Sequence, residues 1–261
     1  MMRKILAMLL AVLMLSMLVA CGNKQDDTTG DTVINVGSLS MTYQTENGDT
    51  YTYEYDKSTT VIITAFSGND EPHAVTVPAM IEDKTVVGIG DEAFFACSNI
   101  SSIELPEGLT TIGDYAFANC EVLTEVRLPS TLQTIGDCAF YSCDALTTAS
   151  LEQTALVSIG QNAYTDCVAL AEVSFPSTLK TIEAGAFLNC TALSSLTLPE
   201  GVATVQTQAF YNCTALASLT LPASLTEIGA WAFNPALRDL ADEAISAPEG
   251  SYAEEYIQSV R

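Results

Sequence analysis

Hydrophobic positions recur along most of the chain with a period of 23 residues. An Ala-aromatic pair marks every unit. The pairs are Ala93-Phe94, Ala116-Phe117, Ala139-Phe140, Ala163-Tyr164, Ala186-Phe187, Ala209-Phe210 and Ala232-Phe233. One spacing is 24 residues and the others are 23. Because a fixed period of this length is typical of stacked repeats, we predict a solenoid of about seven units over residues 86–233.

One half of each unit is expected to form a strand. In L-x-x-V-x-L, for example Leu123, Val126 and Leu128, the last two apolar residues alternate with polar ones, which is the period of a strand. The expected buried pairs are Ile103-Leu105, Val126-Leu128, Val173-Phe175, Leu196-Leu198 and Leu219-Leu221. Proline follows each pair and ends the strand, since it lacks the ladder N–H. Each unit should therefore add one strand to a parallel sheet.

The other half of each unit favours a short helical turn. In Gly-x-x-Ala-Phe-x-x-Cys, the residues Ala116, Phe117 and Cys120 stand at positions i, i+1 and i+4, which one helical turn can point inward together. The expected fold class is therefore an α/β repeat solenoid, with a parallel β-sheet on one face and short helical turns and irregular segments on the others.

The repeat resembles the leucine-rich repeats of the BspA-like, or treponemal, type in bacterial surface proteins, whose pattern is I-G-x-x-A-F-x-x-C-x-x-L-x-x-V-x-L-P. The resemblance covers about residues 86–233 and implies a non-catalytic module for adhesion or protein binding. One unit departs from the pattern. Ala149 and Glu152 replace a large apolar residue and proline, and one residue is inserted before Leu156. We expect a local bulge there.

Caps are predicted at both ends, because a solenoid needs them to cover its last core layers. Residues 32–85 contain alternating tyrosines and degenerate strands without the Ala-Phe unit, so they are assigned to an amino-terminal cap. Residues 234–261 are assigned to a carboxyl-terminal cap, in which Ser251 and Glu254 match a capping box. Apolar residues at helical spacing after Ser251 predict a short helix.

The amino terminus predicts export. Residues 1–20 have Arg3 and Lys4 ahead of an apolar run that is short for a membrane span, which is typical of a signal peptide. Residues 18–21, Leu-Val-Ala-Cys, resemble the lipobox of bacterial lipoproteins. That resemblance implies a lipid on Cys21, a polar tether over residues 21–31, and anchoring to the outer face of the bacterial cell membrane. The alternative is an ordinary signal peptide with a chance cysteine.

The charge of the chain argues against nucleic acid as a partner. Of nine Lys and Arg, two precede residue 21, which leaves seven against 32 Asp and Glu, a net charge of −25 over residues 21–261. Phosphate backbones are bound by clusters of Lys and Arg, and the sequence has no such cluster. The alternative meaning of the acidic excess is a solubilising surface without a specific partner.

Candidate chemistry is sparse. Six cysteines follow the aromatic by three residues: Cys97, Cys120, Cys143, Cys167, Cys190 and Cys213. Stacking places them in one file, which favours buried inert thiols over a tetrahedral metal site. Cys138 lies outside the file, and we expect it to be exposed and a candidate reactive thiol. The only histidine, His73, has no recognisable nucleophile or orienting group, so we expect no enzyme, no metal and no cofactor.

The candidate binding face is formed by the outward positions of the predicted strands. They are Ser102, Glu104, Glu125, Arg127, Thr148, Ser150, Glu172, Ser174, Ser195, Thr197, Ser218 and Thr220. This face is either a protein-binding surface or a plain solvated one. A rival aromatic patch comprises Phe95, Tyr141, Tyr211 and Trp231. We expect a non-catalytic module that binds an unidentified protein of a host or bacterial surface. The alternative is a glycan-binding or structural scaffolding lipoprotein.

Overall fold

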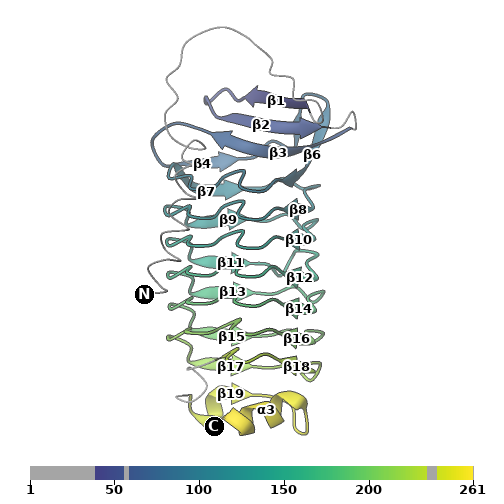
Figure 1. Cartoon of the computed structure of the whole chain (residues 1–261), viewed down its shortest axis with the longest axis vertical. Coiled ribbons are helices and arrows are strands. Elements are labelled where there is room, and N and C mark those ends of the chain that lie inside the picture. Colours follow the sequence, from purple (N-terminus) through teal and green to yellow (C-terminus); the bar gives the residue numbers. More distant parts are fainter. Residues whose placement is uncertain (1–38, 56–58, 234–239, 261) are drawn as a thin grey trace, which may run out of the picture.

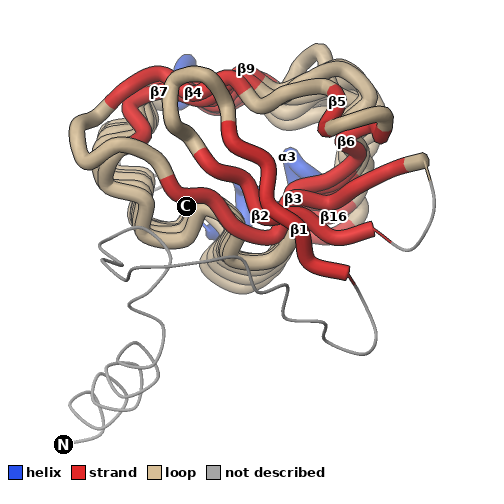
Figure 2. The backbone as a smooth tube through the Cα atoms, turned by 90° about the horizontal axis from the view of Figure 1, so that it is seen from above, coloured by secondary structure: helices blue, strands red, loops and turns tan. Residues whose placement is uncertain are grey.

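The computed structural model describes residues 39–55, 59–233 and 240–260. It shows a long stack of coils, with the amino-terminal strands at one end and a helix at the other (Figure 1). The stack has about eight turns spaced by about 23 residues, which confirms the predicted repeat solenoid. Seen along the stack, successive coils overlie one another (Figure 2). The predicted signal peptide, Cys21 and the tether lie outside the described residues.

The strands form two arrays, which run along opposite sides of the stack (Figure 1). The long sheet contains, in spatial order, β1 (Leu39–Gln44), β2 (Thr50–Tyr55), β3 (Thr60–Ser67), β6 (Lys84–Ile89), β8 (Thr111–Ile112), β10 (Thr134–Ile135), β12 (Ser158–Ile159), β14 (Thr181–Ile182), β16 (Thr204–Val205) and β18 (Glu227–Ile228), with β5 (Met80–Ile81) paired to β6. The opposite side carries three smaller sheets. They are β4 (His73–Thr76), β7 (Ile100–Glu104) and β9 (Glu125–Arg127); β11 (Thr148–Ser150) and β13 (Glu172–Ser174); and β15 (Ser195–Thr197), β17 (Ser218–Thr220) and β19 (Ile245–Ser246).

The predicted strand of each unit is present, but each unit also contributes a second strand. The return segment, in which Thr134 and Ile135 pair in register with Thr111 and Ile112, belongs to the long sheet. Isoleucine points into the core at these positions, and the preceding threonine is exposed or half-buried. Two β-branched residues suit a pleated, half-buried surface, which explains why so short a segment pairs as a strand.

The Ala-Phe segment is a turn and not a helix, so the predicted helical turn is wrong. Tyr115 and Asn119 flank Phe117 with positive φ angles of 55° and 60°. The N–H groups of these three residues donate to carbonyls of the next coil, at 2.9, 2.7 and 2.7 Å. An α-helix would direct them to residue i−4 of the same segment. Apart from the carboxyl-terminal helices, the described part is therefore a β-solenoid with little helix.

A column of eight aromatic rings forms the centre of the core. It runs from Phe66 through Phe94, Phe117, Phe140, Tyr164, Phe187 and Phe210 to Phe233, with neighbouring centroids 4.9 to 5.5 Å apart. Ala65-Phe66 was not recognised as an Ala-Phe unit, because it precedes the next pair by 28 residues. The strands β3 and β4 pair in parallel with β6 and β7, so they add a coil to the stack.

Elements at the two ends of the stack cover the aromatic column. Tyr51 of the antiparallel strands β1 and β2 lies 5.3 Å from Phe66, measured between ring centroids. At the other end a short 3₁₀ turn (Asp242–Ala244) precedes β19 and α3 (Tyr252–Val260). Tyr256 of α3 meets the ring of Phe233 edge-on at 6.3 Å. The hydroxyl of Ser251 accepts the N–H of Glu254 at 3.2 Å and so caps the helix.

The irregular unit contains no strand bulge. Ala149 is 5% exposed and pairs in register with Val173, and the return strand of the unit also keeps its register. The inserted residue is taken up between the two strands, where the buried hydroxyl of Thr154 donates to the carbonyl of Leu151 at 2.7 Å. The insertion therefore lengthens a turn without shifting the register of β11 with β13 or of β10 with β12.

Candidate functional site

The twelve predicted face residues form one outward surface, here called the outer strip. Each of them is exposed or half-buried, while alternate residues such as Ile103, Leu196 and Leu219 are buried beneath. Parallel register places equivalent residues side by side, as with Ser195 and Ser218. The strip follows the small sheets along one side of the stack. Strand pairing is interrupted between β9 and β11 and between β13 and β15, so the strip lies on three separate sheets.

A shallow hollow of about 200 Å³ lies in the outer strip near its amino-terminal end. Its lining residues are Ala74, Val75, Thr76, Ser102, Ile103, Glu104, Glu125 and Arg127. The Nε of Arg127 donates to Oε1 of Glu125 at 2.9 Å. This bond, together with the charges of Glu125 and Glu104, raises the pKa of Arg127. The hollow therefore presents a guanidinium group beside two carboxylates.

The end elements extend the outer strip beyond the predicted residues. Thr76 of β4 pairs with Glu104 of β7, and Ser246 of β19 pairs with Thr220 of β17. Both added residues are exposed. They were missed because neither lies in the 23-residue pattern. The parallel continuation of the strands into both caps is visible only in the fold (Figure 1).

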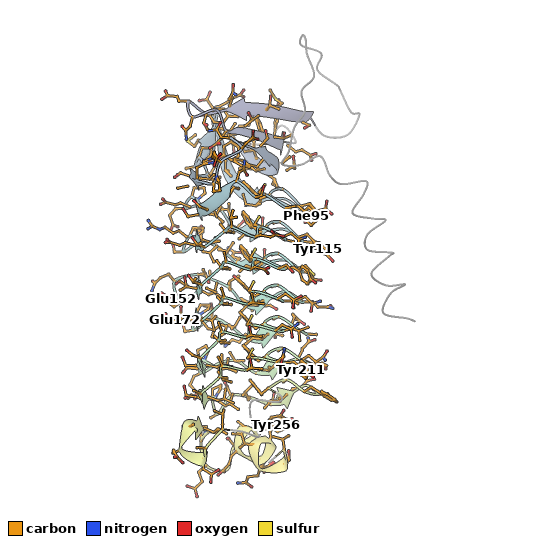
Figure 3. The ribbon with its side chains drawn as sticks, turned by 90° about the vertical axis from the view of Figure 1, so that its left-hand side faces the viewer. Phe95, Tyr115, Glu152, Glu172, Tyr211 and Tyr256 are labelled. Carbon is orange, nitrogen blue, oxygen red and sulfur yellow. The ribbon has the colours of Figure 1, made fainter. Side chains whose placement is uncertain are left out.

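The rival aromatic residues do not form one platform. Trp231 is 59% exposed and contacts Tyr211, with ring centroids 5.9 Å apart, whereas Phe95 and Tyr141 are half-buried. Tyr115, which was not among the predicted residues, is exposed. In Figure 3, Phe95, Tyr115 and Tyr211 project along the edge opposite Glu172 of the outer strip. The aromatic residues and the outer strip therefore face different sides of the molecule.

The six cysteines of the column are buried beside the aromatic rings. Cys97 is disulfide-bonded, so the prediction of a free inert thiol is wrong for that residue. From Cys120 to Cys213, each thiol donates to the carbonyl oxygen of the aromatic residue one coil earlier, at 3.1 to 3.4 Å. Burial raises the pKa of these thiols, to about 12 for Cys120. The thiols consequently act as core groups that satisfy buried carbonyls.

The prediction of an exposed Cys138 is wrong. Cys138 is only 8% exposed, and burial raises the pKa of its thiol above the usual value for cysteine. The reason is its place in the turn. It occupies the same left-handed position as Tyr115, with φ 55°, and a hydrogen bond between the two side chains raises the pKa of Tyr115 to about 12. A thiol that is covered and protonated at neutral pH is a poor nucleophile.

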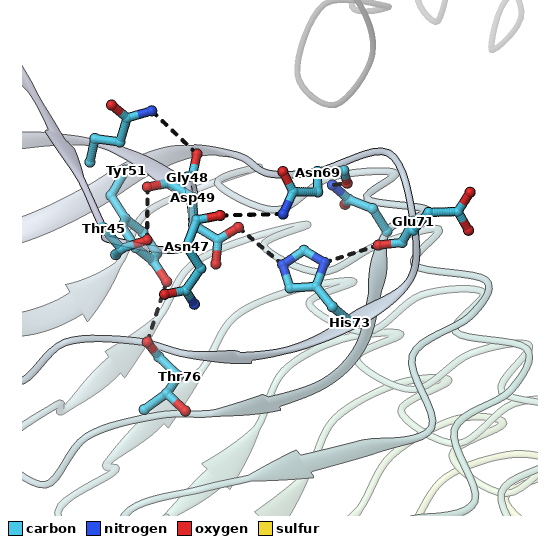
Figure 4. Close-up of polar contacts among 11 residues, drawn as sticks. Thr45, Asn47, Gly48, Asp49, Tyr51, Asn69, Glu71, His73 and Thr76 are labelled. Atoms are coloured by element: carbon cyan, nitrogen blue, oxygen red, sulfur yellow. Dashed lines mark hydrogen bonds and ion pairs between the residues drawn. The ribbon is translucent and has the colours of Figure 1, made fainter.

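His73 links the amino-terminal hairpin to the first coil (Figure 4). Its Nε2 lies 3.0 Å from Oδ1 of Asp49, which is 2% exposed, and its Nδ1 lies 3.0 Å from the carbonyl oxygen of Glu71. Burial lowers the pKa of His73, but these two hydrogen bonds and the negative charge of Asp49 together outweigh burial and leave the pKa raised. Nε2 thus ties His73 to the hairpin, and Nδ1 binds within the segment that contains His73.

Among the described residues, no cluster of three His, Cys, Asp or Glu side chains has the arrangement of a metal site. Within the same residues, no helix combines the length and the apolar character that crossing a membrane requires. The outer strip itself presents hydroxyl and carboxylate groups together with the guanidinium group of Arg127.

Comparison with known proteins identifies the repeat. The family model of the BspA-type leucine-rich-repeat region matches six copies, over residues 87–194 and 157–241. No match was found among curated proteins. A crystal structure of a leucine-rich-repeat protein from T. pallidum is similar at 27% identity and a TM-score of 0.68, covering 80% of this chain and 92% of that one.

Two further crystal structures share the architecture. A leucine-rich-repeat protein from Bacteroides ovatus has 28% identity and a TM-score of 0.50, and the alignment covers 70% of this chain and 54% of that one. The pneumococcal vaccine antigen PcpA is similar in fold, with 20% identity, a TM-score of 0.53, and coverage of 80% and 70%. Because the family model matches more than half of the residues, the protein belongs to the BspA-type leucine-rich-repeat family.

Proposed function

We propose that the protein is an exported, non-catalytic binding module that is lipid-anchored through Cys21 to the outer face of the bacterial cell membrane. In this proposal the outer strip binds a protein on a host or bacterial surface, as in adhesion. Support for display at a surface comes from the signal-like residues 1–20 and from the lipobox-like sequence that ends at Cys21. Family membership supports a protein-interaction role, since leucine-rich repeats are typically interaction modules.

The observation that carries the choice of surface is the hollow around Arg127. Hot spots of protein interfaces are rich in Arg, Trp and Tyr, and Arg127 is the member of the outer strip that belongs to this group. It is held by Glu125 at 2.9 Å beside a hollow of about 200 Å³. The guanidinium group can donate to a carboxylate or carbonyl of a partner, and the small hydroxyl residues along the strip allow a partner backbone to approach closely.

Binding is tested by a solid-phase screen of the purified protein against extracellular matrix proteins and mucin. Arg127→Ala should weaken binding about thirtyfold or more, the cost of losing one interface hot spot. Lys180→Ala is the matched control, because it removes one positive charge from an exposed position next to β14 of the long sheet. Equal effects of the two variants, or binding to mucin glycans alone, would contradict protein binding through the outer strip.

The anchor is tested separately by labelling with radioactive palmitate in a bacterial host. The wild-type protein should incorporate label and fractionate with membranes. Cys21→Ala should incorporate none, because the thioether requires the cysteine sulfur. Failure to label the wild type, or equal labelling of the variant, refutes lipidation while leaving the binding proposal open.

A further inference from the structure

A second hollow lies on the long sheet, away from the outer strip. Its volume is about 420 Å³, within the range of small-molecule sites. Its lining residues are Gln133, Thr134, Ile135, Asp137, Val157, Ser158, Gly160, Gln161 and Glu183. They come from the coils of β10 and β12 and from the residue that follows β14. The hollow is therefore built by three successive coils.

The hollow exists because one column of the repeat changes from glycine to larger residues. Gly136 and Gly160 occupy equivalent positions, and a Cβ on Gly160 would lie 2.5 Å from the carbonyl oxygen of Gly136, so the backbones are in close contact there. In the next coil the same position is Glu183, followed by Gln206. Gly160 thus contributes bare backbone to the lining of the hollow, and Glu183 lines it from the next coil.

The polar groups around the hollow are fixed in place. Ser158 donates to Oε1 of Glu183 at 3.3 Å, and the amide of Gln206 donates to the other oxygen of that carboxylate. Oδ1 of Asp137 accepts the backbone N–H of Gln161 at 2.7 Å. Preorganised carboxylates lose little side-chain entropy when a ligand binds.

The chemistry of the lining selects the ligand. The side chains of Gln133 and Gln161 supply amide donors and acceptors, and Thr134 and Ser158 supply hydroxyls. Both charged lining residues, Asp137 and Glu183, are acidic, so they disfavour phosphates, sulfates and carboxylates. Carboxylates and amides at fixed positions suit a neutral ligand with several adjacent hydroxyl groups, and exposed Val157 offers an apolar contact.

We propose that this hollow between β10 and β12 is a binding site for a neutral saccharide. The site is separate from the outer strip and does not depend on the proposed protein-binding function. Binding should be weak, with a dissociation constant on the order of 1 mM, because the hollow is shallow and several of its groups already have protein partners.

The test is saturation-transfer-difference NMR on the full-length protein with glucose, galactose, mannose and N-acetylglucosamine, and with glucose 6-phosphate as an anionic comparison. At least one neutral sugar should receive saturation, and glucose 6-phosphate should receive less than glucose. The double variant Gln133→Ala/Gln161→Ala should lose at least about tenfold in affinity, as expected when several polar contacts are removed. Alanine occurs naturally at the equivalent positions Ala203 and Ala184, so the coils tolerate it.

The matched control is Thr226→Ala/Thr207→Ala, which makes the same kind of change at the same two columns outside the hollow. It should bind like the wild type. The proposal is overturned if no neutral sugar binds at about 10 mM, well above the expected dissociation constant, or if glucose 6-phosphate binds better than glucose. The proposal is also overturned if the double variant still binds the sugar, or if Trp231→Ala abolishes sugar binding while the double variant does not. Either result would place the sugar at another site.

Discussion

Removing one ring from the middle of the aromatic column should destabilise the whole stack. Phe140 is fully buried, and its ring centroid lies 5.2 Å from that of Phe117 and 5.0 Å from that of Tyr164. Truncation of a buried phenylalanine to alanine costs about 3–5 kcal/mol through lost burial and the cavity left behind. Each aromatic pair contributes about 0.5–1.5 kcal/mol beyond burial, so stacking should account for about 1–3 kcal/mol of the loss.

Urea unfolding followed by circular dichroism measures this loss, and Phe140→Leu separates ring stacking from volume. Leucine refills most of the space but restores neither stack, so its cost should lie between those of wild type and Phe140→Ala. An alanine variant that loses less than about 1 kcal/mol would refute the reasoning, because a cavity of this size could then close freely. A leucine variant as stable as the wild type would show that the rings act only by filling space.

Three further outcomes follow from single contacts. The raised pKa of His73 stabilises the fold fully below its unfolded value of about 6.5, and this stabilisation is lost as pH rises through the folded pKa. The free energy of unfolding should therefore fall as the pH rises above about 6.5 in the wild type and much less in His73→Gln, measured by urea titration at a series of pH values; equal slopes would contradict the Asp49 pair. Cys138 should react with a thiol reagent slowly until the protein unfolds, and rapid labelling of the native protein would disprove its burial. Gly160→Ala should lower the melting temperature, because its Cβ would meet the backbone of Gly136 at 2.5 Å; an unchanged melting temperature would show that the coils can separate.

The period of the aromatic residues predicts the solenoid because stacking requires each ring to meet its equivalent in the next coil. Hydrophobic spacing does not reveal backbone conformation, so the turn around Phe117 was mistaken for a helix. A second signal was present in the sequence. Asn119, Asn189 and Asn212 occupy the equivalent left-handed position, and asparagine adopts that conformation more readily than most residues. Asparagine at a fixed repeat position therefore favours a turn over a helix.

The outer strip could be predicted because alternate side chains of a strand point to opposite faces, which identifies those that point away from the core. The link between His73 and Asp49 could not, since it joins residues 24 apart in segments that do not repeat. The contribution of Phe66 to the column was hidden by its 28-residue spacing. The hollow beside Glu183 arises from lateral contacts between three coils, and a sequence pattern along one coil carries no such information.

The inward and outward columns of the solenoid are under different physical constraints. An inward position must match the coils above and below it, which is why seven of the eight rings are phenylalanine and why the column thiols contact equivalent carbonyls. An outward position is less tightly tied to its equivalents, so one column changes from Gly160 to Glu183 without breaking the register of β12 and β14, although Gly160 itself lies against the backbone of Gly136. Recognition can therefore vary on the surface of this fold while its core stays regular. Arg127 and Glu183 stand where such changes alter the shape or charge of a hollow, and substitutions there should change binding with little loss of stability.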